Sequence, residues 1–249
     1  MATNRGYEDY GEAVAKSILP QHKAVRKFGD RAGLGTSYET IWSEGGIYVY
    51  PSSAQAMTIS SANTNDVNTS GTGAWTVFVE GQDENYNEIS ETVNMNGQSG
   101  VALSNTYLRV YRMRVVTAGS GGVNAGIIYV GTGSITNGKP ATVYALIPAS
   151  VGQTQMCIYT VPAGYTAYLT KFYVTANGQK GVDFLINTRA STANASLQAK
   201  YSGHIQENYQ YEYTSPLVIT EKTDIDISAK VTATSADVAA GFELIMIQN

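Results

Sequence analysis

Apolar and polar residues alternate along most of this chain, in short runs that turn-forming residues separate. The clearest case is the stretch Trp75–Met95, whose first run places Trp75, Val77 and Val79 at every second position. A period of two residues directs alternate side chains to opposite faces of a β-sheet. The intervening Gly81–Glu88 is rich in Gly, Asp and Asn, which tolerate turn conformations. The pattern therefore predicts a β-hairpin with a polar tip of about seven or eight residues.

Similar runs continue to the end of the chain and predict an all-β fold. They recur at intervals of about 10 to 14 residues in the second half, as in β-sandwiches, jelly rolls and barrels. The alternation of strands with helices that marks a parallel α/β fold is absent. Strands are predicted at residues 46–51, 56–61, 101–118, 126–131, 156–162, 166–176, 181–190, 196–203, 208–220, 223–233 and 241–249.

The predicted organisation is an extended N-terminal arm followed by two β-sandwich, jelly-roll-like domains. The arm covers residues 1–45, with a possible short helix from Tyr7 to Leu19 that Pro20 stops. Prolines and glycines within Lys139–Thr154 favour a boundary there, which gives domains at residues 46–145 and 146–249.

Basic residues gather in the predicted arm, where Asp30 is the single acid between Lys16 and Arg31. Two interpretations stay open: a solvated surface strip, or an arm that lies across a larger acidic partner. In the second case aromatic residues would anchor the arm. The residues predicted to bind the partner are Lys16, Lys23, Arg26, Lys27, Phe28, Arg31 and Trp42.

Composition limits the classes of function. A net charge of −4 and a pI of about 5.2 argue against nucleic acid as the main partner. The single Cys157 cannot form an internal disulfide and lies in an apolar run, which predicts a buried, inert thiol. The first residues lack the apolar core of a secretory leader, and no run approaches the ~20 apolar residues of a membrane span. We therefore expect no membrane partner.

The chemistry-bearing residues do not form a catalytic motif. Two histidines, His22 and His204, are too few for an ordinary zinc site. Acids crowd the hairpin, and Asp224 and Asp226 alternate on one predicted strand, as paired carboxylates of a glycosidase could. Hairpin tips and outward strand faces are, however, commonly acidic and solvated. We predict no catalytic, cofactor-binding or metal-binding residue, although oxygen ligands are dense enough in residues 83–88 to make calcium thinkable.

Three tyrosines, Tyr209, Tyr211 and Tyr213, occupy one face of a predicted strand. Such a ladder could stack on bases or sugars, or pack against a neighbouring strand. The interpretation that we favour is a subunit interface, where aromatic residues are enriched.

The hairpin and its surroundings resemble structural proteins of tailed bacteriophages, especially aquatic ones. Residues 73–101 are similar to a pattern TV.V.GLD.NYNEISETV.LNG, and residues 105–110 and 118–126 continue it. Residues 41–51, 158–176, 221–233 and 240–247 extend the likeness to roughly residues 38–249. Gln82 departs from it, because an apolar residue is expected there. The likeness contains no catalytic residue.

The resemblance implies a non-enzymatic virion structural protein of β-sandwich units that assembles as a homo-oligomer, with a trimer favoured. A capsid decoration or cement protein on the outer head surface, bound to the major capsid protein or other virion proteins, fits the size and the lack of chemistry. It would be assembled in the cytoplasm of the bacterial host and reside in the virion. Alternatives are a tail, neck or fibre-adaptor protein, a tail depolymerase, or a carbohydrate-binding receptor-recognition module that uses Tyr209 and Tyr211.

Overall fold

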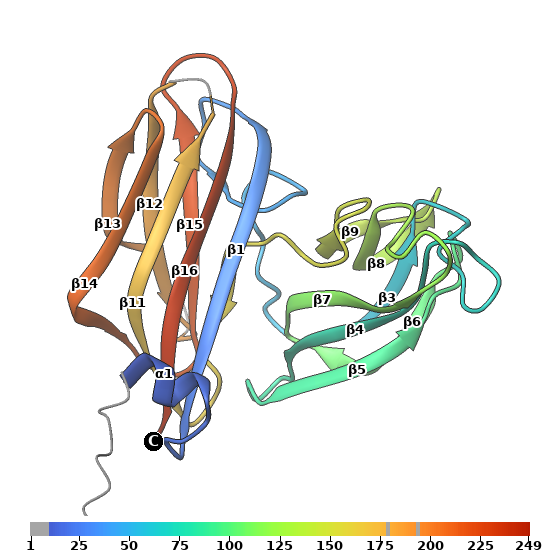
Figure 1. The fold of residues 1–249 in the computed structure, drawn as a ribbon, viewed down its shortest axis with the longest axis horizontal. Helices are drawn as coiled ribbons and strands as arrows, with labels where there is room; N and C mark the ends of the chain where they lie inside the picture. Colours follow the sequence, from blue (N-terminus) through green and yellow to red (C-terminus); the bar gives the residue numbers. More distant parts are fainter. Residues whose placement is uncertain (1–9, 178–179, 193–194) are drawn as a thin grey trace, which may run out of the picture.

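The protein folds into two β-rich lobes (Figure 1). The structure, a computed structural model, describes residues 10–177, 180–192 and 195–249. Helix α1 (Tyr10–Ala15) is shorter than the predicted helix over residues 7–19, of which residues 7–9 lie outside the described part. The strands are β1 (His22–Leu34), β2 (Glu39–Thr40), β3 (Gln55–Ser61), β4 (Ala74–Gln82), β5 (Glu88–Asn94), β6 (Val101–Tyr107), β7 (Arg109–Ala118), β8 (Ile128–Thr136), β9 (Lys139–Ile147), β10 (Ile158–Thr160), β11 (Tyr165–Ala176), β12 (Val182–Ala190), β13 (Gln198–Ile205), β14 (Asn208–Ile219), β15 (Thr223–Val231) and β16 (Ala236–Gln248).

The C-terminal lobe, which consists of β1, β2 and β10–β16, contains an eight-stranded antiparallel ribbon folded back on itself. Its strands pair first with last: β1 with β16, β10 with β15, β11 with β14, and β12 with β13. These pairs alternate between two sheets, with strand orders β1-β16-β11-β14 and β10-β15-β12-β13. The short β2 adds to the second sheet by pairing with β15.

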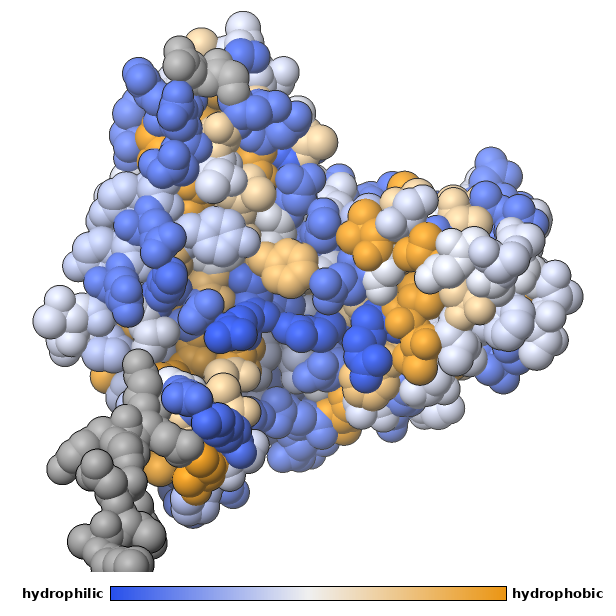
Figure 2. All heavy atoms as spheres, viewed as in Figure 1, coloured by the Kyte–Doolittle hydropathy of each residue, from blue (hydrophilic) through white to orange (hydrophobic). Residues whose placement is uncertain are grey.

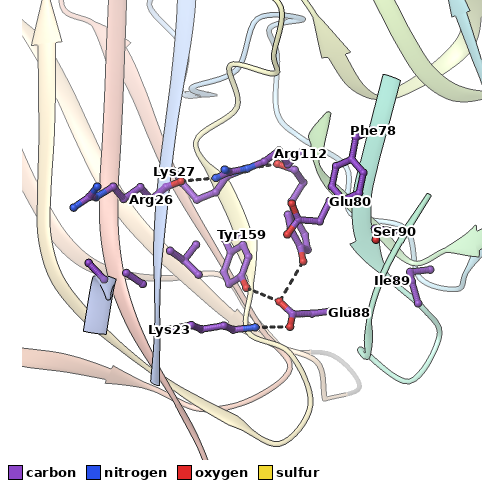
Figure 3. Close-up of a pocket in the computed structure, with 14 residues that line it drawn as sticks. Lys23, Arg26, Lys27, Phe78, Glu80, Glu88, Ile89, Ser90, Arg112 and Tyr159 are labelled. Carbon is purple, nitrogen blue, oxygen red and sulfur yellow. Dashed lines mark hydrogen bonds and ion pairs between the residues drawn. The ribbon is translucent and has the colours of Figure 1, made fainter. Parts of the chain in front are cut away.

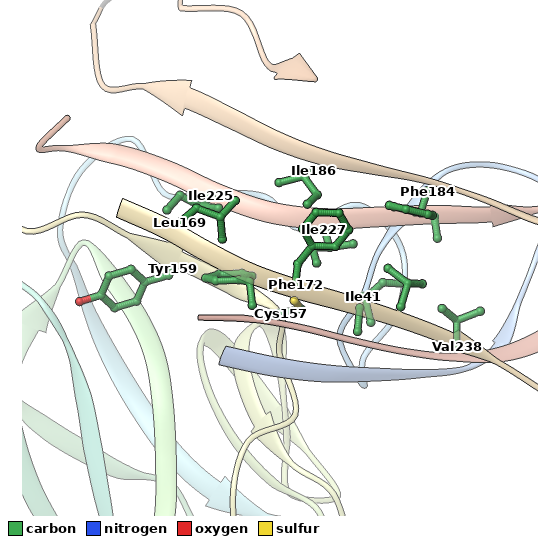
Figure 4. Close-up of a cluster of buried hydrophobic side chains, with 14 of the residues drawn as sticks. Ile41, Cys157, Tyr159, Leu169, Phe172, Phe184, Ile186, Ile225, Ile227 and Val238 are labelled. Atoms are coloured by element: carbon green, nitrogen blue, oxygen red, sulfur yellow. The ribbon is translucent and has the colours of Figure 1, made fainter. Parts of the chain in front are cut away.

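The two sheets of the C-terminal lobe face each other across a hydrophobic core (Figure 4). Phe172 and Phe242 come from one sheet, and Phe184 and Ile227 from the other, and none is more than 1% exposed. Complete burial of a side chain of this size stabilises the fold by about 1.5–3 kcal/mol. Cys157 lies in the same core, so the prediction of a buried thiol is confirmed.

The N-terminal lobe, β3–β9, is inserted between β2 and β10. Its two small antiparallel sheets have the orders β6-β3-β8-β9 and β5-β4-β7 and enclose a second hydrophobic cluster. The predicted hairpin forms β4 and β5, with Val77 opposite Val93 in the register and both side chains buried. Its tip, residues 83–87, is shorter than predicted because β4 and β5 extend to Gln82 and Glu88.

A buried carboxylate organises the loops of the N-terminal lobe. Asp66, fully shielded from solvent, accepts hydrogen bonds from the backbone N–H groups of Ala74 and Ala125, both at 2.7 Å, and of Gly126 at 2.9 Å. The hydroxyl of Ser61 donates a fourth at 2.6 Å. Buried charge is tolerated only when it is satisfied in this way. One side chain thus ties the loop at residues 62–73 to the loop at residues 119–127.

The chain passes between the lobes at one place in both directions. Trp42 and Met156 form an isolated antiparallel bridge, and the N–H of Cys157 donates to the carbonyl of Ile41 at 2.9 Å. These two connections pack directly on β1 at Gly29, where a Cβ atom would lie 2.3 Å from the Ile41 carbonyl oxygen. Any larger residue at Gly29 would push the crossing away from the sheet.

The fold confirms the all-β class but corrects three details. Residues 22–34 are not an extended arm: they form β1, which pairs with β16 from His22 to Leu34 because its apolar and small residues continue the sheet. Residues 46–51 form no regular strand, and Ile47 and Val49 are each 73% exposed. The strand order of the N-terminal lobe does not repeat the folded ribbon of the C-terminal lobe, so the lobes are not two copies of one sandwich.

Candidate functional site

The junction between the lobes contains several of the charged residues that the sequence singled out, among them Lys23, Arg26, Lys27 and Asp224. A cleft of about 610 Å³ opens there, between β1 of the C-terminal lobe and the β5-β4-β7 sheet of the N-terminal lobe (Figure 3). Figure 2 shows that the most hydrophilic residues on this face gather between the lobes. The charged residues that line the cleft are Lys23, Arg26, Lys27, Glu80, Glu88 and Arg112.

Glu88 joins the two lobes across the cleft. Its carboxylate accepts hydrogen bonds from Lys23 on β1 and, at 3.5 Å each, from the hydroxyls of Tyr111 and Tyr159 (Figure 3). Lys23 also lies 4.3 Å from the ring centre of Tyr165. The side chains of Lys23 and Glu88 are 31% and 35% exposed, so water screens this ion pair and its contribution to stability is small.

Lys27 is buried beside the cleft without a carboxylate partner. Its ammonium donates to the backbone carbonyl of Tyr111 and lies 5.6 Å from the centre of that ring. Burial, and then the neighbouring Arg112, lower the pKa of Lys27 to about 7. The attraction of Glu80 opposes this shift without offsetting it. The cleft therefore has, at its inner wall, an amine whose pKa lies near neutral pH.

A second, drier contact between the lobes is formed by Arg109 of β7 and Asp224 of β15. Their guanidinium and carboxylate form a bidentate pair at 2.9 and 3.1 Å, with side chains 7% and 4% exposed. Arg109 also donates to the carbonyl of Pro51 at 2.7 Å. Asp224 receives further bonds from Thr160 at 2.6 Å and from Arg189 at 3.0 Å. Every strong donor and acceptor of the pair is thus satisfied, as a buried ion pair requires.

Asp226 lies two residues further along β15, on the same face. Asn187 donates to it at 2.9 Å and the hydroxyl of Tyr50 at 3.4 Å. Burial is the main cause that raises the pKa of Asp226 to about 6, and the charge of Asp224 adds to it. Asp226 is therefore only partly ionised in mildly acidic solution.

These two aspartates correct the expectation that acids on outward strand faces are solvated. Asp224 and Asp226 are 3% and 5% exposed, because Arg109 of the N-terminal lobe and the connecting residues Tyr50 and Pro51 cover the face of β15 that points away from the core. Paired with cations and amides in a closed junction, they serve as contacts between the lobes. Nothing in the local pattern TDIDIS predicts a second lobe over that face.

The acids of the hairpin also bind within the chain. Asp83 accepts from the N–H groups of Asn85 and Asn87 in its own turn, and Glu84 accepts from the N–H of Ala54. Glu91 accepts from Ser104 and Asn105 at 2.8 and 3.0 Å, on the neighbouring strand β6. Burial alone would raise the pKa of Glu91, but these backbone bonds lower it below its ordinary value.

Gln82, the departure from the phage pattern, has a role at the same junction. Its amide nitrogen donates to the carbonyl of Thr160 at 2.8 Å, and the residue is fully buried. An apolar residue would leave that carbonyl without this donor. The position at the hairpin end therefore links β4 of the N-terminal lobe to β10 of the C-terminal lobe.

The residues predicted to form a binding arm are divided by the structure. Lys23, Arg26 and Lys27 line the cleft, whereas Arg31 forms an ion pair with Glu39 at 2.8 Å. Three further members lie elsewhere: Lys16 follows α1 and pairs with Glu12, Phe28 is half-buried on β1, and Trp42 is buried in the core of the N-terminal lobe. Their partner-binding role stays a prediction.

The tyrosine ladder closes the far edge of the C-terminal lobe. Tyr209, Tyr211 and Tyr213 are half-buried and pack, with Tyr201 of β13, against the ring of Phe172. Tyr209 and Tyr211 are stacked, with ring centres 6.4 Å apart. The packing of the ladder lies within one chain, and its role in an oligomer interface stays a prediction.

Sequence reasoning missed Arg109, Glu88 and Asp224 as contacts between the lobes. The available signal was the combination of the acidic strand TDIDIS with RVYRMRVV, a strand that carries three arginines. Within the described ranges, no group of three or more His, Cys, Asp or Glu side chains is placed to hold a metal ion. In the same ranges, no helix has the length and apolar character needed to cross a membrane.

Comparison with known proteins gives distant structural likenesses. No family model and no curated protein matches the chain. Among solved structures it is similar to that of infectious bursal disease virus Gx strain, with 10% identity, a TM-score of 0.29, and coverage of 92% of this chain and 72% of the other. Similarity to the Gt strain and to the VP2 subviral particle of that virus has TM-scores of 0.21 and 0.20, with 10% identity, 92% of this chain and 73% of each of those. Likenesses of this strength assign neither fold nor function.

Proposed function

We propose that this chain is a non-enzymatic structural protein of a virus particle. The strand order of the C-terminal lobe carries the proposal. Four antiparallel strand pairs placed alternately in two sheets are the arrangement of a jelly roll, a fold used by viral capsid, lectin and cupin domains. The resemblance of residues 38–249 to phage structural proteins selects the first of these classes.

The packing of the lobe supports a structural role over ligand binding inside the jelly roll. Its interior is filled by apolar side chains, among them Phe172, Phe184 and Phe242. The tyrosines that a glycan would need are engaged with these rings and with one another. The described part of the interior therefore resembles a packed core more than a ligand cavity.

Within the particle, the role that we propose is capsid decoration or cement. A homo-oligomer, with a trimer favoured, would bind the major capsid protein on the outer head surface and hold neighbouring subunits together through buried area. The contacts between the lobes support this role, because a buried ion pair and the bridge between the two connecting segments at Trp42 and Met156 fix the shape that must fit the shell. A tail, neck or fibre-adaptor position is the alternative.

A particle reconstruction tests the proposal. We expect density for both lobes on the head, and particles without the protein should release their genome at a lower temperature. Density on the tail would reject the cement role and keep the virion role. Absence of the protein from purified particles would reject both. Light scattering on the purified protein should give the mass of three 26.6-kDa chains.

A further inference from the structure

We propose that the cleft between the lobes binds an extended, acidic peptide segment of a neighbouring virion protein, which adds as a strand to the free edge of β1. This inference deepens the proposed function and rests on it for the source of the peptide. Its basis is a free strand edge, an excess of basic side chains around that edge, and an open wall opposite.

Strand β1 has a free edge beside the cleft. This strand is the outermost of its sheet, so only one side of its backbone is paired. The N–H of Gln248 donates to the carbonyl of Gln21, and hydrogen-bonded pairs alternate along an antiparallel ladder. Lys23, Val25 and Lys27 therefore bond to β16, and the backbone groups of the residues between them point away from it.

The outward residues are Ala24 and Arg26, and both line the cleft. The carbonyl of Arg26 accepts from Arg112 at 2.7 Å, which confirms the direction of this edge. Within the described ranges, the N–H groups of Ala24 and Arg26 and the carbonyl of Ala24 have no protein partner. Unpaired groups of this kind are a template for an added strand.

The charge of the cleft favours an acidic peptide. Four basic side chains line it, Lys23, Arg26, Lys27 and Arg112, against the two acids Glu80 and Glu88. Lys23 pairs with Glu88, and Arg26 pairs with Glu243 of β16 at 3.3 Å, so the excess amounts to one positive charge when Lys27 is protonated. This excess occurs in a chain whose net charge is −4. Burial lowers the pKa of Lys27 to about 7, so an incoming carboxylate would restore its full charge. The cleft is therefore complementary to an acidic segment.

The wall of the cleft opposite β1 is formed by the β5-β4-β7 sheet. Phe78, Glu80 and Ser90 project from the face of the β5-β4-β7 sheet that points away from its own core. The cleft volume of about 610 Å³ lies in the range of ordinary ligand sites. From Lys23 to Lys27 the edge has room for about five extended residues, at about 3.3 Å each. One strand fits there once the side chains of Glu88 and Arg112, which reach Lys23 and the Arg26 carbonyl, move aside, whereas the edge of a second folded sheet would meet the N-terminal lobe.

The test uses the full-length protein and two synthetic heptapeptides, one alternating Glu and Val and one alternating Lys and Val. We expect the acidic peptide to bind in calorimetric titrations at 50 mM salt and the basic peptide not to bind. Amide hydrogen exchange of Ala24 and Arg26 should slow when the acidic peptide is bound. Equal binding of both peptides, or unchanged exchange at these two amides, would overturn the proposal.

Matched variants separate this site from general electrostatics. Arg26→Glu should weaken binding about tenfold or more, because it places a like charge beside the peptide. Lys200→Glu makes the same change on the exposed far strand β13 and should leave binding unchanged. Ala24→Pro removes an outward N–H that β16 does not use, and should weaken binding while the melting temperature shows a folded protein. Equal losses from Arg26→Glu and Lys200→Glu would reject a defined site.

Each of the two proposals, the virion role and the peptide site, can be rejected independently of the other. If the acidic peptide binds but the protein is absent from particles, the peptide site in the cleft is supported and the virion role is rejected. If the protein lies on particles but the peptide does not bind, the virion role stands and the cleft is no docking site. Tighter binding of double-stranded DNA than of the acidic peptide would reject the peptide as the occupant.

Discussion

Strands β14 and β15 carry the same alternating pattern but differ in what covers them. On β14 the tyrosines face the core and Asn208, Gln210 and Glu212 are exposed. On β15 the isoleucines face the core, yet Asp224 and Asp226 on the other face are buried as well. The difference arises because Arg109 of the N-terminal lobe and the connecting residues Tyr50 and Pro51 pack over β15, whereas the outer face of β14 remains open. Alternation therefore identifies the core face of a strand but does not determine whether its other face is covered or exposed.

The largest effect should come from breaking the buried pair over β15. Arg109→Ala leaves the carboxylate of Asp224 without its bidentate partner and should destabilise the protein by about 3–5 kcal/mol. Urea unfolding measures this difference. Arg114→Ala is the control: this exposed arginine of the same strand stacks on Phe78 and its loss should change stability by less than about 0.5 kcal/mol. Equal effects of the two variants would contradict a buried junction.

The protonation of Asp226 should give the next largest effect. The pKa of Asp226 is raised from 3.8 to about 6 in the folded protein, so folding favours the protonated form. Its contribution to stability is full below pH 3.8 and is lost as the pH rises through 6. Asp226→Asn should therefore be more stable than the wild type by about 2–3 kcal/mol at pH 8, with a gain that shrinks towards pH 4. A gain independent of pH in unfolding titrations would refute the shifted pKa.

On β14, a substitution on the core face should destabilise the protein more than a substitution on the solvent face. Tyr211→Ala removes a half-buried ring that packs on Phe172 and Tyr201, and should cost about 2 kcal/mol in unfolding experiments. Gln210→Ala, its neighbour on the exposed face, should stay within about 0.5 kcal/mol of the wild type. A larger loss for Gln210→Ala would mean that β14 is covered in solution, as an oligomer interface would require.

The smallest effect should come from the screened contact across the cleft. Glu88→Gln removes the charge that faces Lys23 and should cost less than about 1 kcal/mol. The difference from wild type should shrink further in 1 M salt, where exposed charges are screened. A loss as large as that of Arg109→Ala would show that the cleft is drier than its exposure indicates.

The sequence was sufficient for the parts of the fold that local pattern controls. The hairpin around Val77 and Val93, the strands β10–β16 and the buried Cys157 follow from periodicity and apolar runs. The placement of β1 did not follow, because its partner β16 lies more than 200 residues away and its basic residues resemble a solvated strip. Pairing over that distance leaves no local signal.

The candidate site was predictable only in part. Lys23, Arg26 and Lys27 were singled out for their charge, and the structure places them together at the cleft. Arg109 and Asp224 were not matched, because their contact depends on how one lobe lies against the other. The hairpin acids were visible as a cluster, but their hydrogen bonds to turns and to β6 require the folded backbone.

The two lobes form one fixed unit through the covered face of β15. The most direct measurement is the distance distribution between spin labels on Ser99 of the N-terminal lobe and Ser202 of β13, each replaced by cysteine; both positions are exposed. We predict one narrow peak, which broadens in the Arg109→Ala variant. A broad distribution in the otherwise unaltered protein would show that the lobes move freely and would contradict the claim.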